Sequence, residues 1–168
     1  MGLLLGILSD THLLDRPVPG HVIEALGGAD MILHAGDILD MSVIEQLSGI
    51  AETYAVRGNM DHGDAARLLP ESRVLEVGGF RIGLTHGHGP PHGMPGKVRG
   101  MFDEVDCVVF GHTHQPLIEK SGGVLFFNPG SPTDRMFAKA STVGLLEVTD
   151  RLRPRIVHLG RPPEESGA

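Results

Sequence analysis

The chain has 168 residues, of which 40% are hydrophobic and 21% charged, and its formal net charge is −7. This acidic balance argues against tight, non-specific binding to nucleic acid or to anionic membranes, so we expect neither as a stable partner. Aromatic residues make up 4% of the chain, with no Trp and one Tyr, so a platform for stacking the bases of single-stranded nucleic acid is poorly supplied.

The beginning of the chain does not favour export. The apolar run at 3–8 is short, no basic region precedes it, and Asp10 follows where a signal peptide would need small residues. No apolar stretch approaches the roughly 20 residues that cross a bilayer. A lone cysteine, Cys107, excludes a disulfide framework and fits a reducing compartment. We therefore expect a cytoplasmic protein.

The first part of the chain alternates apolar runs with helical patterns. Strands are predicted at 3–8, 31–33 and 53–56, and helices around 22–26 and 43–47 lie between them. Short continuous apolar runs bounded by Gly and Asp are typical of buried strands in an α/β sheet. This order predicts βαβ units.

The rest of the chain is richer in strands. Strands are predicted at 80–84, 107–110, 115–119, 124–127, 142–148 and 155–159, and a weaker helix at 95–102. The whole pattern predicts an α/β fold of mixed sheets packed together with helices outside. We expect a single domain over residues 1–160 and a flexible tail at 161–168.

Polar clusters follow six of the predicted strands directly. Functional groups gather at the carboxyl ends of strands in α/β sheets, so these clusters could face one crevice. Five of the clusters contain carboxylate, amide or imidazole groups that can bind a metal, and these are Asp10, His12, Asp37, Asn59, His86, His112 and His114. Each motif alone often arises by chance, but their joint placement favours a metal centre.

The clusters also occur in a recognisable order. The motifs are Asp10-x-His12, Gly36-Asp37, Gly58-Asn59-x-Asp61, His86-Gly87-His88 and Gly111-His112-x-His114. This set resembles the calcineurin-like metallophosphoesterase superfamily. The compact length and the element Asn128-Pro129-Gly130-Ser131 resemble its small bacterial and archaeal phosphodiesterase branch, which is similar to the retromer scaffold subunit. The resemblance implies a four-layer α-β-β-α sandwich of two mixed sheets, with the metal site at the carboxyl ends of the strands.

The resemblance also implies two metal sites that share Asp37. One would take Asp10, His12, Asp37 and His114, and the other Asp37, Asn59, His86 and His112. Oxygen and imidazole ligands without a thiolate suit Mn²⁺, Fe, Zn²⁺ or Ni²⁺ better than Mg²⁺ or Ca²⁺, and we expect Mn²⁺ first. Two such cations would make a bridging hydroxide available for in-line attack on phosphorus, while Asn59 helps to hold the phosphate oxygens.

The sequence departs from the family pattern at Met60. Many larger relatives have a His there that is thought to assist the leaving group, and a thioether cannot donate a proton. We take His88 as the candidate donor, with a solvated loop residue as the alternative. Asp61 is expected to accept a hydrogen bond from a ligand or a loop amide, with a catalytic role as the less favoured alternative. His34 is expected to support the site or pack in the core.

The function predicted from these residues is hydrolysis of a small phosphate ester by a dinuclear-metal phosphodiesterase. A phosphomonoesterase or nucleotidase on the same site remains an alternative. A scaffold that keeps the fold but has lost catalysis is a second, favoured by Met60 and disfavoured by the presence of all seven ligands. The sequence does not identify the natural substrate, and it leaves a homo-oligomer open.

Overall fold

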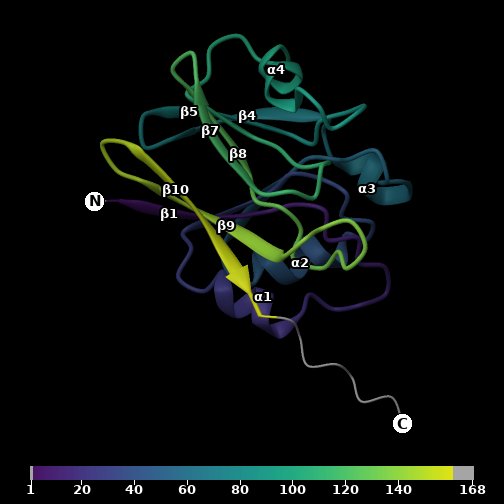
Figure 1. Ribbon diagram of the computed structural model, residues 1–168. Helices are drawn as coiled ribbons and strands as arrows, with labels where there is room; N and C mark the ends of the chain where they lie inside the picture. Colours follow the sequence, from purple (N-terminus) through teal and green to yellow (C-terminus); the bar gives the residue numbers. More distant parts are fainter. Residues whose placement is uncertain (1, 161–168) are drawn as a thin grey trace.

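The computed structural model describes residues 2–160, so the predicted tail at 161–168 lies outside the described residues. Two five-stranded sheets pack face to face. Helices α1 (Gly20–Ala25) and α2 (Ser42–Ser48) cover the outer face of one sheet, and α4 (Met94–Arg99) covers the other (Figure 1). This arrangement confirms the predicted four-layer sandwich. Within the described range, no helix is long and apolar enough to cross a membrane.

The first sheet has the strand order β10-β9-β1-β2-β3. Its strands are β1 (Leu3–Leu8), β2 (Met31–His34), β3 (Glu52–Ala55), β9 (Ser141–Val148) and β10 (Leu152–Leu159). Strands β1, β2 and β3 run parallel and are joined through α1 and α2, which confirms the predicted βαβ units. Strand β9 pairs antiparallel with both β1 and β10.

The second sheet has the strand order β4-β5-β6-β8-β7. Its strands are β4 (Ser72–Val77), β5 (Phe80–Thr85), β6 (Cys107–Val109), β7 (Leu117–Ser121) and β8 (Val124–Asn128). Strands β5, β6 and β8 run parallel, and β4 and β7 close the two edges antiparallel. Strand β4 and helix α3 (Gly63–Leu68) were absent from the sequence prediction. Neither carries an apolar run, because β4 is a half-exposed edge strand and α3 buries only Ala65.

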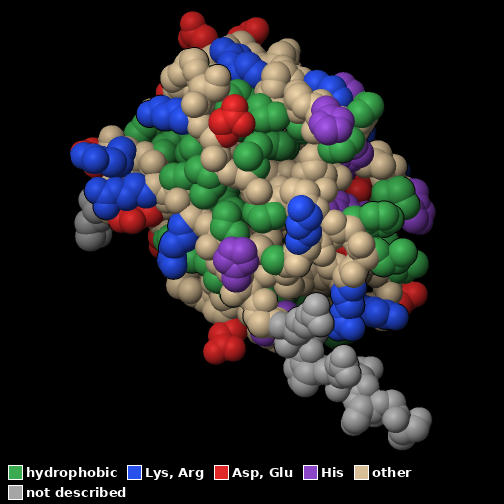
Figure 2. Space-filling model, in the orientation of Figure 1, with side chains coloured by type: hydrophobic (Ala, Val, Ile, Leu, Met, Phe, Trp, Pro, Cys, Tyr) green, Lys and Arg blue, Asp and Glu red, His purple; other side chains and the backbone are tan. Residues whose placement is uncertain are grey.

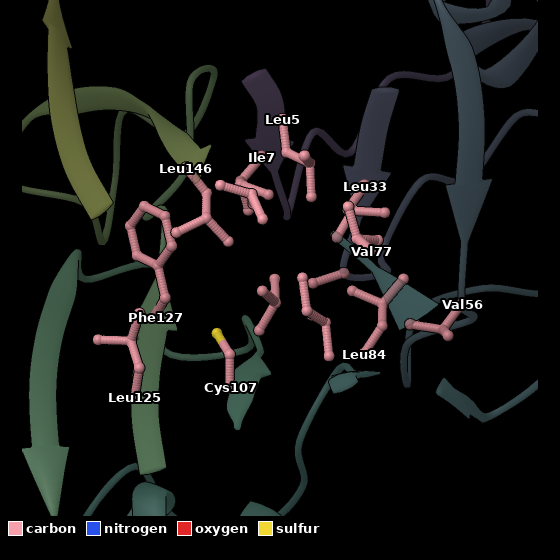
Figure 3. Packing of buried hydrophobic residues seen from close by; sticks show 14 residues of the cluster. Leu5, Ile7, Leu33, Val56, Val77, Leu84, Cys107, Leu125, Phe127 and Leu146 are labelled. Atoms are coloured by element: carbon pink, nitrogen blue, oxygen red, sulfur yellow. The ribbon is translucent and has the colours of Figure 1, made fainter. Parts of the chain in front are cut away.

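The main core lies between the two sheets. Leu5, Ile7 and Leu33 of the first sheet face Leu84 and Phe127 of the second (Figure 3). Side chains alternate along β8, so that Leu125 and Phe127 face the main core, whereas Val124 and Phe126 pack under α4. Burial in the main core raises the pKa of Cys107 to about 12, so this thiol stays neutral.

Each sheet contains three parallel strands, and the carboxyl ends of all six lie at the same end of the sandwich. The chain leaves β1, β2 and β3 in the first sheet and β5, β6 and β8 in the second through short polar loops. Asp10 N donates to Gly36 O, and Gly111 N donates to His86 O, so these loops are hydrogen-bonded to one another in pairs. The packing of the sheets thus brings loops that are far apart in the sequence to one place.

Candidate metal centre

Four of the predicted ligands form one compact group. Asp10, His12, Asp37 and His114 each offer one ligand atom, and these atoms all lie within 4.8 Å of one another. His114 Nε2 lies 3.2 Å from Asp10 Oδ1, and His12 Nε2 lies 3.5 Å from Asp37 Oδ2. This is the set that the family resemblance assigned to one metal.

The other three predicted ligands lie against this group. His86 Nε2 is 3.0 Å from Asn59 Oδ1, and His112 Nδ1 is 3.2 Å from the same oxygen and 3.3 Å from His86 Nε2. Asp37 joins the two groups, because its Oδ2 lies 3.5 Å from His12 Nε2 and 3.3 Å from His86 Nε2. All seven predicted ligands are therefore brought together around Asp37.

In three of the imidazoles, the ring nitrogen that points away from the cluster is hydrogen-bonded to an oxygen acceptor. His86 Nδ1 lies 2.8 Å from Ala35 O, His112 Nε2 lies 2.8 Å from Gly89 O, and His114 Nδ1 lies 2.5 Å from Asp134 Oδ2. Each of these nitrogens has to donate its proton to the oxygen. In the neutral ring the other nitrogen then carries the lone pair, and in all three cases that nitrogen faces the cluster.

Two polar atoms inside the cluster lack the partners that buried groups normally have. Asp10 Oδ2 accepts hydrogen bonds from Ser9 Oγ at 2.6 Å and from His112 N at 3.0 Å. Asp10 Oδ1 and His12 Nε2 are buried and have no hydrogen-bond partner among the described residues. A divalent cation would satisfy both atoms, since carboxylate oxygen and imidazole nitrogen are suitable ligands. The residues present therefore fit a metal.

The backbone at the site is held in an uncommon conformation. Asp10 (φ 57°), His12 (φ 45°), Asp37 (φ 58°), His112 (φ 74°) and His114 (φ 61°) all lie in the left-handed region. Such residues cost energy and persist only where the surrounding structure fixes them, which is typical of functional sites. The glycine of Gly111-His112 is required for a different reason, because a Cβ there would collide with Ser9 Oγ and lie 2.6 Å from Asp10 Oδ2.

The carboxylates and imidazoles of the cluster shift one another's protonation. Burial alone would raise the pKa of Asp10, but the neighbouring imidazoles of His114 and His12 hold it well below its usual range. The pKa of Asp37 is likewise lowered, because the effect of its burial is outweighed by His86. The pKa of His114 is raised to about 9, first by Asp10 and then, against the effect of burial, by Asp134. The two acids are therefore ionised and ready to bind a cation.

Protons should compete with metal at His114, and this predicts a pH dependence. Because a metal has to displace the His114 proton, we expect the apparent metal dissociation constant to fall about tenfold per pH unit between about pH 6 and about pH 8. In the metal-free protein the raised pKa means that the His114 ion pairs stabilise the fold below about pH 6.5. This contribution is lost as the pH rises through about 9.

The check is thermal unfolding with and without Mn²⁺ at both ends of this pH range. The rise in Tm on adding Mn²⁺ grows as the apparent metal dissociation constant falls, so it should be larger at the higher pH. An equal rise at the two pH values would contradict proton competition at this site.

Asp61 lies behind the loop that follows β2. Its Oδ1 accepts from the backbone N–H groups of Ile38 (2.9 Å) and Leu39 (2.8 Å), and its Oδ2 accepts from those of Asp37 (3.0 Å) and Gly58 (2.7 Å). The carboxylate thus fixes the backbone on both sides of Asp37. Its hydrogen bonds run to loop amides, one of the two kinds of partner proposed for it.

His34 is completely buried beneath the same loops. Gly36 N donates to His34 Nδ1 at 3.1 Å, so the proton of the neutral ring is on Nε2, which lies 3.1 Å from Thr11 Oγ1. Burial lowers the pKa of His34 to about 4, which keeps the ring neutral. The imidazole bridges the loops after β1 and β2, and its two nitrogens face these partners rather than the cluster.

A pocket of about 250 Å³ adjoins the second group of ligands. Its lining includes Asn59 and His86 together with His88, Glu71 and Arg57. His88 is exposed at this position. Arg57 Nη1 donates to Ala66 O at 3.2 Å and to Leu69 O at 3.1 Å, so this guanidinium holds the end of α3 rather than standing free for a phosphate.

One contact of the site was missed in the sequence. Asp134 accepts the His114 Nδ1 proton, and its carboxylate also accepts from the backbone N–H groups of Met136, Phe137 and Ala138. It stands in the loop between β8 and β9, just after Asn128-Pro129-Gly130-Ser131. Ser131 Oγ donates to Asp10 O at 2.8 Å and accepts from Asp134 N at 3.0 Å. The turn motif was the available signal, since it ties this loop to the first ligand.

Replacing Asp134 with Ala is expected to weaken metal binding by about 10–100-fold, because the partner that orients a ligating His is lost. Calorimetric titration of the metal-free protein with Mn²⁺ measures the change. Asp150→Asn is a suitable control, since Asp150 lies in the turn between β9 and β10 and its side chain is 77% exposed. Unchanged affinity in Asp134→Ala would show that His114 is oriented without this carboxylate.

A four-layer sandwich that holds carboxylates and imidazoles in one cluster at its strand ends is the structure of a metal-dependent phosphoesterase. The chain belongs to the calcineurin-like phosphoesterase superfamily, whose domain model matches residues 3–151. Members of this superfamily use divalent metals, and the compact group of Asp10, His12, Asp37 and His114 is a metal-binding cluster of the expected kind. This confirms the family predicted from the motifs.

Individual relatives agree with this assignment. A probable metallophosphoesterase of Methanothermobacter thermautotrophicus is 35% identical over 164 residues, which cover 95% of each chain. Phosphodiesterase YfcE of Escherichia coli K12 is 32% identical over 162 residues, covering 83% of this chain and 84% of that protein. The crystal structure of a Vps29 single mutant from Entamoeba histolytica matches with a TM-score of 0.73 and 25% identity, over 94% of this chain and 100% of that one.

Proposed function

We propose that this protein is a dinuclear-metal phosphodiesterase. The observation that carries the proposal is the position of Asp37, whose Oδ2 lies within 3.5 Å of His12 Nε2 in one group and within 3.3 Å of His86 Nε2 in the other. One carboxylate oxygen between two sets of ligands is what a pair of cations about 3.5–4 Å apart needs. The names of the relatives, metallophosphoesterase and phosphodiesterase, support the same reaction.

The residues would divide into two metal sites. His12, His114 and Asp10 would hold one cation, Asn59, His86 and His112 would hold the other, and Asp37 would contact both. With no thiolate in the set, we propose Mn²⁺ first, with Fe, Zn²⁺ or Ni²⁺ as alternatives. Such cations would activate water near neutral pH, which is the chemistry that in-line attack on phosphorus requires.

The protein's own groups would orient the ester and supply the proton. Asn59 offers an amide beside the second group, and its Nδ2 could donate to a phosphate oxygen. Met60, which follows it, is 53% exposed and has no proton to give. His88 lies in the wall of the same pocket as Asn59, and we propose it as the proton donor to the leaving group. A role for Asp61 in orienting the Asp37 loop is proposed in preference to a catalytic one.

Two alternatives remain tied to particular features. A phosphomonoesterase could use the same cluster, since nothing in the geometry of the seven ligands distinguishes the ester classes. A scaffold without catalysis would explain Met60, but it would not need all seven ligand side chains turned toward one centre. We also propose a cytoplasmic location, which the free and buried Cys107 supports.

The test is metal analysis together with turnover. Purified protein loaded with Mn²⁺ should bind two metal ions per chain and hydrolyse bis(p-nitrophenyl) phosphate, and treatment with a chelator should abolish this activity. A parallel assay with p-nitrophenyl phosphate separates diester from monoester preference. Two bound ions without turnover of either substrate would favour the scaffold, and one ion per chain would reject the dinuclear centre.

A further inference from the structure

The loop between β8 and β9 exposes two large hydrophobic side chains beside the metal centre. Met136 is 83% exposed and Phe137 is 71% exposed, the highest values for large hydrophobic residues in the described part of the chain. The rings of Phe137 and His114 have centroids 6.3 Å apart and planes inclined at 74°. Single exposed apolar residues are ordinary, but a pair held next to a candidate ligand requires a reason.

Two more exposed apolar residues belong to the loops that carry ligands. Leu14 and Met60 are each 53% exposed, and they follow His12 and Asn59 closely in the chain. Figure 2 shows hydrophobic side chains gathered beside histidines at the edge of the molecule where α3 and the loop before β9 lie. We call Leu14, Met60, Met136 and Phe137 the apolar rim.

The position of Phe137 is fixed from two sides. Asp134 Oδ1 accepts from Met136 N at 2.8 Å and from Phe137 N at 3.2 Å, and Gln115 Nε2 donates to Phe137 O at 2.8 Å. The same Asp134 carboxylate orients His114, and Gln115 directly follows His114 in the chain. The backbone that carries the Phe137 ring is therefore fixed relative to the metal centre, and this reduces the entropy lost when a ligand binds.

We infer that the apolar rim, with Phe137 as its main contact, binds the organic group of the phosphate ester. The inference rests on the proposed function, because the metal centre has to hold the phosphoryl group. A phosphate ester has a charged end, which suits a cationic centre, and an organic end, which lies within reach of a ring adjacent to His114. The preferred substrates are then esters with an aromatic or other apolar group, rather than esters of small polar alcohols.

Phosphonates test this preference without any turnover. Calorimetry on the Mn²⁺-loaded protein should show phenylphosphonate binding about tenfold more tightly than methylphosphonate, the size of effect expected from one aromatic contact. Phe137→Ala should reduce this ratio to about twofold or less and change the dissociation constant of methylphosphonate less than about twofold. Leu3→Ala is the matched control, since Leu3 is an exposed apolar residue at the opposite end of β1 from Asp10, and it should leave the ratio unchanged.

Three outcomes would overturn the inference. One is a wild-type ratio near one, and another is a preference for phenylphosphonate that survives in Phe137→Ala. The third is an equal loss of both phosphonates in that variant, which would mean that Phe137 supports the metal centre instead of contacting the organic group. Turnover is measured separately, so a protein that prefers phenylphosphonate but hydrolyses no ester would refute the proposed function and leave the apolar rim as a binding site.

Discussion

Asp37→Asn is expected to lower kcat/KM for an activated phosphodiester on the order of 10³-fold, equivalent to about 4 kcal/mol of transition-state stabilisation. Asp37 Oδ2 lies near nitrogens of both groups, at 3.5 Å from His12 Nε2 and 3.3 Å from His86 Nε2. An amide of the same shape removes the negative charge that would offset the two cations of the proposed centre. The number of metal ions bound per chain should therefore fall as well.

The fold should survive this substitution. Asp37 Oδ1 accepts from Met60 N at 2.9 Å, and the carbonyl oxygen of an Asn can keep that bond. The measurements are initial rates, metal content and thermal unfolding of the metal-free protein. Asp150→Asn makes the same chemical change at an exposed turn at the other end of the first sheet, and should retain full activity. If Asp37→Asn turns over substrate at the wild-type rate, a shared carboxylate is not part of the reaction.

Whether a part of the structure could be predicted depended on whether its signal is local in the sequence. The inner strands could be predicted because both of their faces are buried, and such strands have continuous apolar sequences, as at Leu3–Leu8. The edge strand β4 has only one half-buried face, and its alternating residues Ser72–Val77 give no such run. Helix α3 is six residues long and has no apolar stripe, so it could not be predicted from the sequence either.

The predicted ligands and the residues that orient them differ in the same way. Asp10, Asp37 and His114 lie in short polar clusters that follow apolar runs in the sequence. Asp134 lies 20 residues from its partner His114 in the sequence and has no motif of its own, and the contact arises from the packing of the β8–β9 loop against the centre. The left-handed backbone at five predicted ligands was equally hidden, because Asp and His adopt it only where neighbouring loops fix them.

Asp61→Ala should test how far the site depends on that backbone. The substitution leaves the N–H groups of Asp37, Leu39 and Gly58, together with that of Ile38, without their acceptor. Hydrogen bonds to a charged group contribute more than neutral ones, and water can replace part of them, so we expect a loss of about 2–4 kcal/mol in the free energy of unfolding. We expect metal affinity to fall by about tenfold or more, since the loop that presents Asp37 is released.

The two roles considered for Asp61, holding the loop and acting in catalysis, predict different patterns of activity. If the carboxylate only holds the loop, the loss of activity in Asp61→Ala should follow the loss of metal and should be largely recovered at saturating Mn²⁺. Asp64→Ala removes an exposed acid in α3, with a side chain that is 71% exposed, and should change neither stability nor metal binding appreciably. The contrary result would be an Asp61 variant that keeps its metal affinity and its stability, yet loses activity at every Mn²⁺ concentration. This result would place the carboxylate in the chemical step, because loss of a group that acts only on the substrate changes neither metal affinity nor the free energy of unfolding.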